Sequence, residues 1–583
     1  MKKTLFTIFI FISLQSLCQT QTLFQQKSIE AYAKIYGVVK YYYPDSIDKN
    51  FKWDNFGVNA INELLKSKNK FDLIKKLEII FEPVAPLLII TSDSNYTYTN
   101  NAPVNKSDTY RFWQYKGFSN EEDEVKKYVY NKKLVRNYNY NNPVLTQLEF
   151  NYAPLKNEVL KIKLFDSAYC YIPICLNEKN IQRIYTTSYK KAFKKCKKIE
   201  NSNLQHEAIN FLVEIWNIVQ HFYPLTAYTN YNFDSIFNYV PIVLKSESKN
   251  DLLKIKYEIL NKFKDGHSSI NREYCGLGLD YLQIDTFYYI NKCSKVINLK
   301  PGDLILSVNK TSPHNYFTTS KSYFTGSDAF VDYTTSFYFG FGFYNDTVDI
   351  SVLQNKKDTL NVKLVRDKFF MKNFELLHSD RPEFYPINDS IVYINLCKLS
   401  YPAFLKLKDS LAYYKGIIAD ERHEGYPNQK LLGFFSSDTL RSPYFVTAQN
   451  IYPFQKNVLN DTAYFNIVPQ TDQIKSKIVF LIGNGSISAT ETSVSIIKNY
   501  KLGTIIGEKT AGCNGNAVYF VLKYFTFYFT GMEVINQDKS TFNNIGISPD
   551  IEVKPTLSGI KAGKDEVLEY AIEYLQKKLV NEK

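Results

Sequence analysis

The segment that constrains the fold most is "KIVFLIGNGSISATETSVSIIKNY", residues 477–500. It begins with a short apolar run that predicts a buried strand, and it ends in a run that reads as a helix. Small residues fill the turn between the two. Enzymes with α/β folds often place a nucleophile in such a strand–turn–helix segment. The alternative is that a serine of the turn only caps the helix.

Strand and helix patterns alternate around this segment. The runs "SIVYINLCKL" and "KGIIAD" predict two more buried strands, and "LGTIIGEKTAGCNG" predicts a strand that ends in a glycine-rich loop. The run "GISPDIEV" closes the series. This alternation predicts one α/β domain, because strands that alternate with helices usually form a parallel sheet covered by those helices.

Six short motifs follow one another in the second half of the chain. They are a "DGH" turn, an insert with "GLG" and "KPGDLI", then "ADER", "SISATE", "GEKTAG" and "GISPD". In this order they resemble the tail-specific, or C-terminal-processing, serine peptidases, over about His267 to Val553. The resemblance implies a crotonase/ClpP-like α/β catalytic core with a PDZ-like domain, peptide or unfolded-protein substrates, and no cofactor.

The resemblance also implies the residues that attack the substrate. The nucleophile would be Ser488, and a helix start places its oxygen near the positive end of the helix dipole. The N–H groups of Ala489 and Gly425 would hold the oxyanion. The family commonly has two glycines in the second loop, whereas this chain has Gly425 followed by Tyr426.

A serine nucleophile needs a general base, and His267 of the "DGH" turn is the expected one. The chain has six histidines, and histidine has an ordinary pKa close to neutral. The alternative for His267 is a residue that merely follows a helix C-cap at Gly266. His423 also lies in a small-residue turn and is a competing candidate.

The family divides by its base. One branch uses a lysine of the glycine-rich loop, where this chain has Cys513. The tricorn-like branch uses a histidine oriented by a glutamate near "GISPD". At that place this chain has Asn543 and Asn544, and an asparagine can orient a histidine by hydrogen bonding. A Ser–His enzyme of this branch is therefore expected.

The PDZ-like segment predicts peptide capture. Its "CGLGLD" turn would hold a terminal carboxylate on free backbone N–H groups, while the peptide adds a strand to the sheet. The residues assigned to this turn are Gly276, Leu277, Gly278 and Leu279.

A long repeat organises the first half of the chain. Residues 35–56 reappear as residues 215–236, with Pro44 matching Pro224 and Trp53 matching Phe233. Two copies at one long offset predict a duplicated helical unit rather than a solenoid, with both aromatic side chains buried.

The N-terminus predicts export. "MKK" precedes the apolar run "TLFTIFIFISL" and then Ser16-Leu17-Cys18, which is typical of a signal peptide cleaved near Cys18. The run is too short to span a membrane, and no later run is long enough. The mature chain is therefore expected in the periplasm or outside the cell.

Composition excludes some other classes. Seven cysteines remain after the leader, without the spacing of a zinc site, so no metal is expected and Cys275–Cys293 is the expected disulfide. A net charge of +13 over 583 residues is too dilute to indicate nucleic acid. The sequence does not predict the oligomeric state.

The expected protein is thus an exported serine endopeptidase. One alternative is a peptide-binding protein on the same fold with weak or lost activity, because Tyr426, Cys513 and the two asparagines depart from the family. Another is a surface scaffold built on the N-terminal modules. The expected segments are a signal peptide at 1–18, helical units at 19–90 and 201–272, a β-rich module at 91–200, a PDZ-like domain at 273–366, a catalytic core at 367–560 and a C-terminal helix at 561–583.

Overall fold

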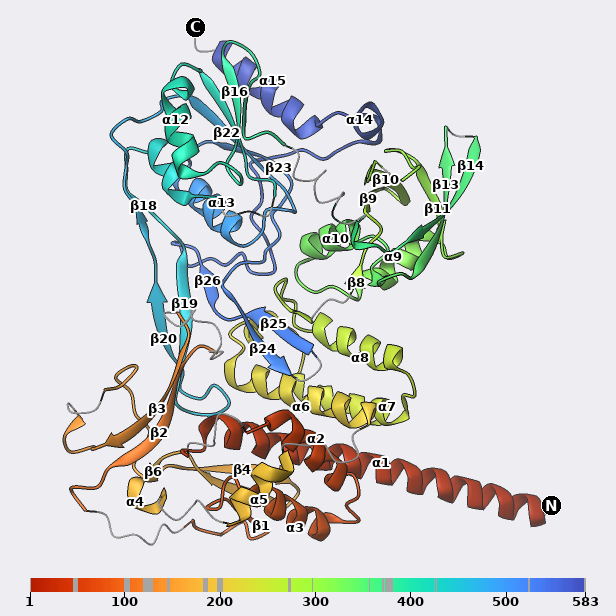
Figure 1. The fold of residues 1–583 in the computed structure, drawn as a ribbon, viewed down its shortest axis with the longest axis vertical. Coiled ribbons are helices and arrows are strands. Elements are labelled where there is room, and N and C mark those ends of the chain that lie inside the picture. The colour runs from red at the N-terminus through yellow and green to blue at the C-terminus, as the bar shows by residue number, and fades with distance from the viewer. Residues whose placement is uncertain are drawn as a thin grey trace.

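The chain folds into a mixed α/β protein with several domains, as predicted (Figure 1). A domain built on a largely parallel sheet lies at one end, an insert lies beside it, and the N-terminal half lies at the other end (Figure 1). The computed structural model describes residues 2–45, 51–98, 105–118, 129–143, 147–181, 187–196, 203–270, 274–295, 297–355, 357–369, 372, 381–423, 425, 427–522 and 525–580.

The two helical units have the same order of elements. In each, a long helix stops just before the matched proline and shorter helices follow, which agrees with a duplication. Phe233 is buried as predicted, but Trp53 is only partly buried, so that half of the prediction is wrong. The first unit comprises α1 Lys2–Tyr42, α2 Trp53–Leu64 and α3 Lys70–Phe81, and the second comprises α6 Leu204–Phe222, η2 Thr226–Tyr228, η3 Phe233–Tyr239, α7 Val240–Lys245 and α8 Lys249–Asn261.

Helix α1 includes the segment predicted to be a signal peptide and continues beyond it. Cleavage near Cys18 stays a prediction. Among the residues that the structure describes, no helix is both long enough and apolar enough to cross a membrane.

The β-rich region is not a separate module. Strand β19 of the second half pairs antiparallel with β2, with Gln449 opposite Lys116, so both halves of the chain share one sheet. Figure 1 shows β19 and β20 running from the upper domain down to this region. Its elements are β1 Ile89–Thr91, β2 Tyr110–Lys116, β3 Asn131–Tyr138, β4 Val159–Phe165, β5 Ala168–Pro173, β6 Leu176–Asn177, α4 Glu178–Ile181 and α5 Thr187–Cys196, with β19 Tyr444–Asn450 and β20 Leu459–Ala463.

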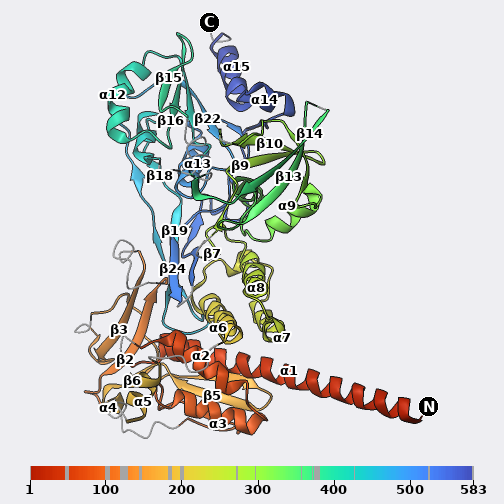
Figure 2. The ribbon, with the colours of Figure 1, turned by 45° about the vertical axis from the view of Figure 1, so that its right-hand side comes forward.

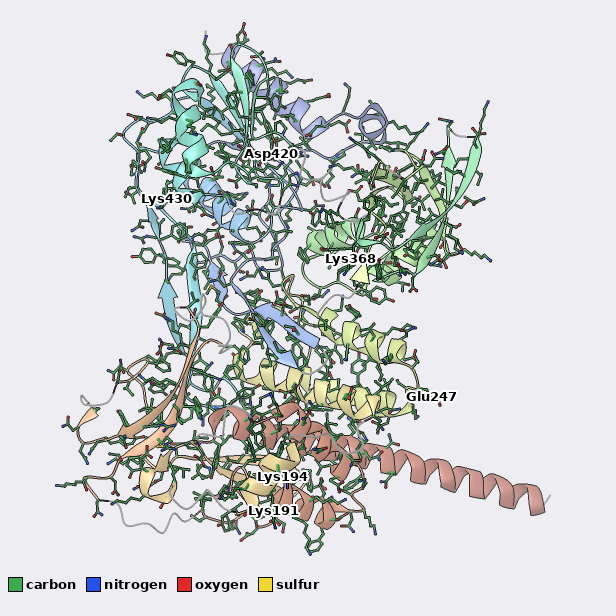
Figure 3. All side chains as sticks on the ribbon, viewed as in Figure 1. Lys191, Lys194, Glu247, Lys368, Asp420 and Lys430 are labelled. Atoms are coloured by element: carbon green, nitrogen blue, oxygen red, sulfur yellow. The ribbon has the colours of Figure 1, made fainter. Side chains whose placement is uncertain are left out.

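The basic run "KKAFKKCKK" covers residues 190–198, and its residues 190–196 lie on α5. Lys191 and Lys194 are exposed there. Figure 3 shows both at the lower end of the molecule, far from Asp420 of the upper domain. These two lysines are therefore remote from the parallel sheet.

The insert is an antiparallel sheet in the order β14-β13-β11-β10-β9, so β9 forms one edge. Helix α10 packs along β9. Cys275 and Cys293 are free thiols, so the predicted disulfide is wrong; the Cys293 thiol instead donates to the Leu299 carbonyl over 3.1 Å. The elements are β8 Tyr274–Cys275, β9 Leu279–Ile284, β10 Phe287–Cys293, β11 Leu304–Val308, α9 Pro313–Lys321, α10 Asp328–Phe337, β12 Gly342–Phe343, β13 Thr347–Gln354 and β14 Asp358–Val365.

The upper domain is a six-stranded sheet in the order β15-β16-β17-β22-β23-β27, parallel from β16 onward. The carboxyl ends of these parallel strands meet at one edge, where the turn before α13 also lies. Apolar clusters cover both faces, one of them built with α15. The predicted C-terminal helix is therefore part of the core. The elements are β15 Phe384–Pro386, β16 Ile391–Asn395, α12 Tyr401–Leu411, β17 Gly416–Asp420, η4 Gln429–Phe434, β18 Leu440–Arg441, β21 Asn466–Ile467, β22 Lys477–Ile482, α13 Ala489–Tyr500, β23 Thr504–Gly507, β26 Glu533–Ile535, β27 Ile551–Glu552, α14 Leu557–Ala562 and α15 Glu566–Val580.

A hairpin joins the upper domain to the second helical unit. It is formed by β24 Ala517–Leu522 and β25 Phe525–Thr530, and β25 pairs with β7 Ser269–Ile270. Strand β7 directly follows the "DGH" turn. In Figures 1 and 2 the hairpin lies between the upper domain and α6. The pairing brings the end of β25 to the histidine turn.

Candidate active site

Ser488 has a strained backbone at the start of α13. Its φ is 57° and its ψ is −112°, in a region that non-glycine residues seldom occupy and that costs about 1–3 kcal/mol. It stands at the N-cap position, yet its side chain makes no capping hydrogen bond. The helix-cap interpretation required that bond and is therefore wrong. The Ser488 hydroxyl is therefore not engaged in capping α13.

Buried hydrogen bonds stabilise this strained turn. The Ser488 N–H donates to the Cys513 carbonyl over 2.8 Å. The Ser486 hydroxyl donates to the Glu421 carbonyl over 2.5 Å and accepts from the Gly483 N–H over 3.1 Å. Ser486 is fully buried, so its hydroxyl serves the structure of the turn.

Glu491 anchors the glycine-rich loop to the first turn of α13. Its carboxylate accepts from the Thr510 hydroxyl over 2.6 Å, the Gly512 N–H over 2.6 Å and the Cys513 N–H over 2.7 Å. Burial raises the pKa of Glu491 to about 7, while these donors act to lower it. The loop that binds the Ser488 N–H is thereby held against the helix start.

His267 lies in the turn between α8 and β7 and is partly buried. Its Nδ1 lies 2.9 Å from the Thr530 hydroxyl oxygen. Its backbone N–H donates to Asp265 over 3.0 Å. Thr530 therefore contacts the ring of this histidine and Asp265 contacts its backbone. Neither residue was among the site residues predicted from the sequence.

Cys513 joins the histidine turn to the serine turn. A methyl group added at Gly266 would lie 2.7 Å from the Cys513 sulfur and 2.8 Å from its Cβ. The carbonyl of Cys513 is the acceptor for Ser488 N–H. The structure thus brings together the turns of Ser488 and His267, although more than two hundred residues separate them in the sequence.

We expect Gly266→Ala to lower kcat because the added methyl group must displace either Cys513 or the histidine turn. The overpacking should also cost about 1–3 kcal/mol of stability. Gly483→Ala is the matched control, since its methyl group would lie 3.8 Å from the nearest atom, Arg422 Cγ. Steady-state kinetics and thermal unfolding of both variants measure the effect. Full activity in Gly266→Ala would mean that this contact does not position the histidine.

The two expected oxyanion donors lie on neighbouring segments. Ala489 is the first residue of α13, and the first N–H groups of a helix have no intrahelical acceptor. Gly425 follows β17 and lies so close to Cys397 that an added methyl group would be 2.9 Å from its Cβ. The Thr490 hydroxyl donates to the His423 carbonyl over 3.2 Å, which ties the Gly425 loop to α13. Tyr426 lies outside the described residues.

Residues 433–553 match the family model described as peptidase family S41. The chain resembles the peptidases of family S41. The matched residues include Ser488, Thr530 and both asparagines, and they exclude His267 and Gly425. No curated protein matches the sequence.

Solved structures support the S41 resemblance at the level of the fold. Mature CPAF complexed with lactacystin is similar at a TM-score of 0.53 and 12% identity, over 64% of this chain and 99% of that chain. Mature CPAF is similar at a TM-score of 0.50 and 13% identity, over 64% and 95%. The tricorn protease is more distant, at a TM-score of 0.35 and 14% identity, over 81% and 46%. The family match supports a serine peptidase, and the CPAF structures support the fold.

Two groups of predicted site residues do not form the expected contacts. Thr530 takes the position at His267 Nδ1 that was assigned to Asn543 or Asn544, so that prediction is wrong. The Asn543 amide donates to the Val534 carbonyl over 3.2 Å, and the Asn544 N–H donates to the Gly512 carbonyl over 2.8 Å.

The turn at residues 276–279 is buried. The N–H of Leu277 donates to the Phe339 carbonyl over 2.9 Å. Gly278 has a φ of 69°, which favours glycine there. The expectation of a free N–H at Leu277 is therefore wrong.

His423 is not suited to act as the general base. Burial lowers its pKa to about 3, so the ring would accept a proton only weakly near neutral pH. It lines a cleft of about 830 Å³ between the insert and the upper domain, next to the turn at residues 483–485. Of the two histidine candidates, His267 is the one whose ring is oriented by neighbouring side chains.

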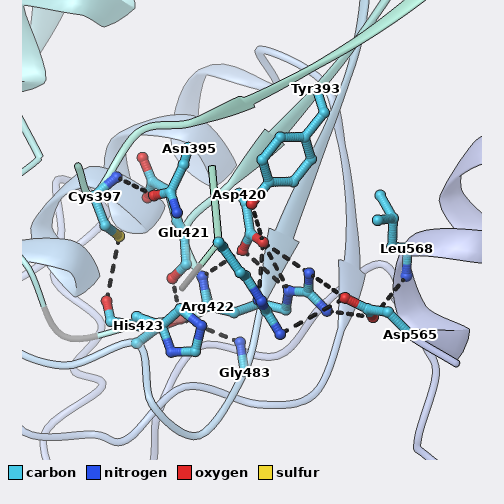
Figure 4. A network of polar contacts seen from close by, with 12 residues as sticks. Tyr393, Asn395, Cys397, Asp420, Glu421, Arg422, His423, Gly483, Asp565 and Leu568 are labelled. Carbon is cyan, nitrogen blue, oxygen red and sulfur yellow. Dashed lines mark hydrogen bonds and ion pairs between the residues drawn. The ribbon is translucent and has the colours of Figure 1, made fainter. Parts of the chain in front are cut away.

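A buried ion-pair network holds the end of β17, the strand that leads into the loop of His423 and Gly425 (Figure 4). Arg422 donates to Asp420 over 2.7 Å and to Asp565 of the C-terminal segment over 2.7 Å. Arg381 donates to Asp420 over 2.9 Å. Burial acts to raise the pKa of Asp420, but the two arginines hold it well below its usual range.

We expect the stability of the protein to fall as pH rises because of Glu421. Burial raises the pKa of this carboxyl from 4.5 to about 8. Between these values the folded chain keeps a proton that the unfolded chain has released, so the free energy of unfolding falls by at most about 1.4 kcal/mol per pH unit. Glu421→Gln should remove that part of the slope and keep the bond from the Ser493 hydroxyl.

Chemical denaturation at pH 5 to 9 measures this slope. Glu573→Gln, on an exposed part of α15, is the matched control, since its side chain is 67% exposed. An unchanged slope in Glu421→Gln would show that Glu421 is ionised throughout this range.

Proposed function

We propose that the chain is an exported serine endopeptidase with Ser488 as nucleophile and His267 as general base. Two features of Ser488 support this most. Its backbone is strained, and its hydroxyl makes no helix-capping hydrogen bond. Strain of this kind is retained where function requires it. The contact through Cys513 between the serine and histidine turns supports the pairing of the two residues.

The proposed reaction proceeds through an acyl-enzyme. Ser488 Oγ attacks a peptide carbonyl while His267 takes the hydroxyl proton. The N–H groups of Ala489 and Gly425 hold the charge that develops on the carbonyl oxygen. His267 then gives its proton to the leaving amine, and a water molecule, deprotonated by the same ring, releases the acyl group.

A second candidate is a peptide-binding protein with weak or lost turnover. The observation that favours it is Asn543 and Asn544 at the place where the tricorn-like branch has a glutamate. Without a carboxylate in that position, the charge on the His267 ring would be less stabilised during the reaction.

The insert would take part in substrate binding if it works as a PDZ-like domain. Strand addition would occur at β9, the edge strand beside α10. The Ser336 hydroxyl of α10 lies 3.0 Å from the Tyr281 nitrogen and 2.5 Å from its carbonyl oxygen. A peptide that adds a strand at this position must first displace Ser336.

Export rests on the composition of residues 1–18. Secretion with cleavage near Cys18 would place the mature chain in the periplasm or outside the cell. Mass measurement of the N-terminal peptide of the mature protein tests this part of the proposal separately from the enzyme activity.

A fluorophosphonate probe tests the proposed function directly. Reaction with the purified mature chain should place the label on the peptide that carries Ser488, because such probes react with activated serines. No label in the folded wild-type chain would favour the peptide-binding alternative. A label on another serine would refute the assignment of Ser488.

A further inference from the structure

Asp265 lies at the centre of a buried cluster of hydrogen bonds behind His267. Its side chain is 3% exposed, and that of Thr530 is 1% exposed. The carboxylate accepts from the Thr530 hydroxyl over 2.6 Å, the Thr530 N–H over 2.7 Å, the His267 N–H over 3.0 Å and the Ser268 hydroxyl over 3.1 Å. A buried carboxylate with four donors is fully satisfied as an acceptor.

These contacts fix the direction of the hydrogen bond at the histidine. The Thr530 hydroxyl has one proton, and Asp265 accepts it. The Thr530 oxygen can then only accept from His267, so the ring proton lies on Nδ1. A neutral imidazole with its proton on Nδ1 has its lone pair on Nε2. This is the form that a general base needs if Nε2 is to take the serine proton.

We propose that Thr530 and Asp265 are positioning residues that hold His267 in the Nδ1–H tautomer. The chain Asp265–Thr530–His267 takes the place of the carboxylate that contacts the histidine in a Ser-His-Asp triad. Asp265 thus orients the ring through the threonine hydroxyl. The one hydroxyl proton of Thr530 cannot point to both Asp265 and His267 Nδ1. This proposal rests on the proposed function, but the tautomer itself does not depend on turnover.

A purely structural role is the competing explanation. The N–H of Thr530 also binds Asp265, and that bond helps dock the end of β25 on the histidine turn. A variant that only weakened this docking would lower stability without changing the tautomer. The experiments must therefore measure the ring as well as the rate.

Thr530→Val is the central variant, because valine keeps the size and branching of threonine and removes only the hydroxyl. We expect kcat to fall about 10²- to 10⁴-fold, the range for a misoriented general base, with little change in KM. Thr530→Ser restores a hydroxyl and should recover most of the rate. Thr526→Val is the matched control, since Thr526 is buried on the same face of β25.

The tautomer is measured on the full-length chain by NMR of ¹⁵N-labelled histidine, with His267→Gln used to identify the signal. We expect Nδ1–H in the wild type and in Thr526→Val, and a mixture or Nε2–H in Thr530→Val. An Nε2–H ring in the wild type would overturn the proposal. So would a Thr530→Val chain that keeps both its rate and its tautomer.

The outcomes separate this proposal from the proposed function. If wild type shows Nδ1–H and Thr530→Val loses it, but no peptide is cleaved and no probe reacts, the positioning is correct and the peptidase assignment fails. If peptide cleavage depends on Ser488 and His267 but Thr530→Val behaves like Thr526→Val, the peptidase assignment holds and the positioning proposal fails.

Discussion

Ser488→Ala should abolish peptide cleavage and leave the free energy of unfolding nearly unchanged, whereas Ser488→Gly should abolish cleavage and stabilise the fold. The loss of rate should be on the order of 10⁶-fold, as expected when a serine nucleophile is removed. Alanine keeps the backbone strain at φ 57° and ψ −112°, and no cap bond is lost. Glycine adopts that conformation without the penalty of about 1–3 kcal/mol.

Turnover of a peptide substrate and denaturant unfolding of the three chains measure these effects. The pair of variants separates the chemical role of the hydroxyl from the conformational cost of holding it in place. A drop in stability of about 1 kcal/mol in Ser488→Ala, with activity retained, would indicate an ordinary helix cap. Equal stability of the alanine and glycine variants would show that the turn is not strained.

His267→Gln should reduce kcat about 10⁴- to 10⁶-fold, because the serine hydroxyl then has no base to take its proton. Glutamine keeps a polar side chain of similar size beside Thr530, so the turn should remain folded. His314→Gln, on an exposed part of α9, is the matched control and should keep full activity.

The rate of fluorophosphonate labelling gives a second measurement that needs no peptide substrate. It should fall in His267→Gln and stay unchanged in His314→Gln. A His267→Gln chain that is labelled and turns over at the wild-type rate would exclude His267 and reopen the search for the base.

Local patterns predicted the parts of the site that depend on short segments. The turn before α13 follows from an apolar strand, small residues and a helical run in residues 477–500, and the family resemblance then selected Ser488 and Ala489 within it. His267 could be chosen because its turn follows an amphipathic helix and has no counterpart in the first repeat. Asp265, two residues before it, could have been singled out by the same turn.

Long-range strand pairing accounts for two of the errors. Thr530 reaches His267 only because β25 pairs with β7, and no local pattern specifies which strand adds to a two-residue one. For the same reason, local patterns could not predict that β19 pairs with β2. This pairing merges the β-rich region with the second half of the chain. The disulfide was wrong because spacing in the sequence does not report on which thiols face each other.

The order of synthesis has a consequence for how the chain becomes active. Thr530 follows His267 by 263 residues, and it also follows Ser488. A growing chain therefore carries its histidine and its serine before it carries the strand that turns the histidine ring. If His267 is the base as proposed, the nascent protein would lack an oriented base until β25 has been made and docked, and we expect it not to cut itself or its neighbours. Completion of the chain through β25 would then act as an activating step.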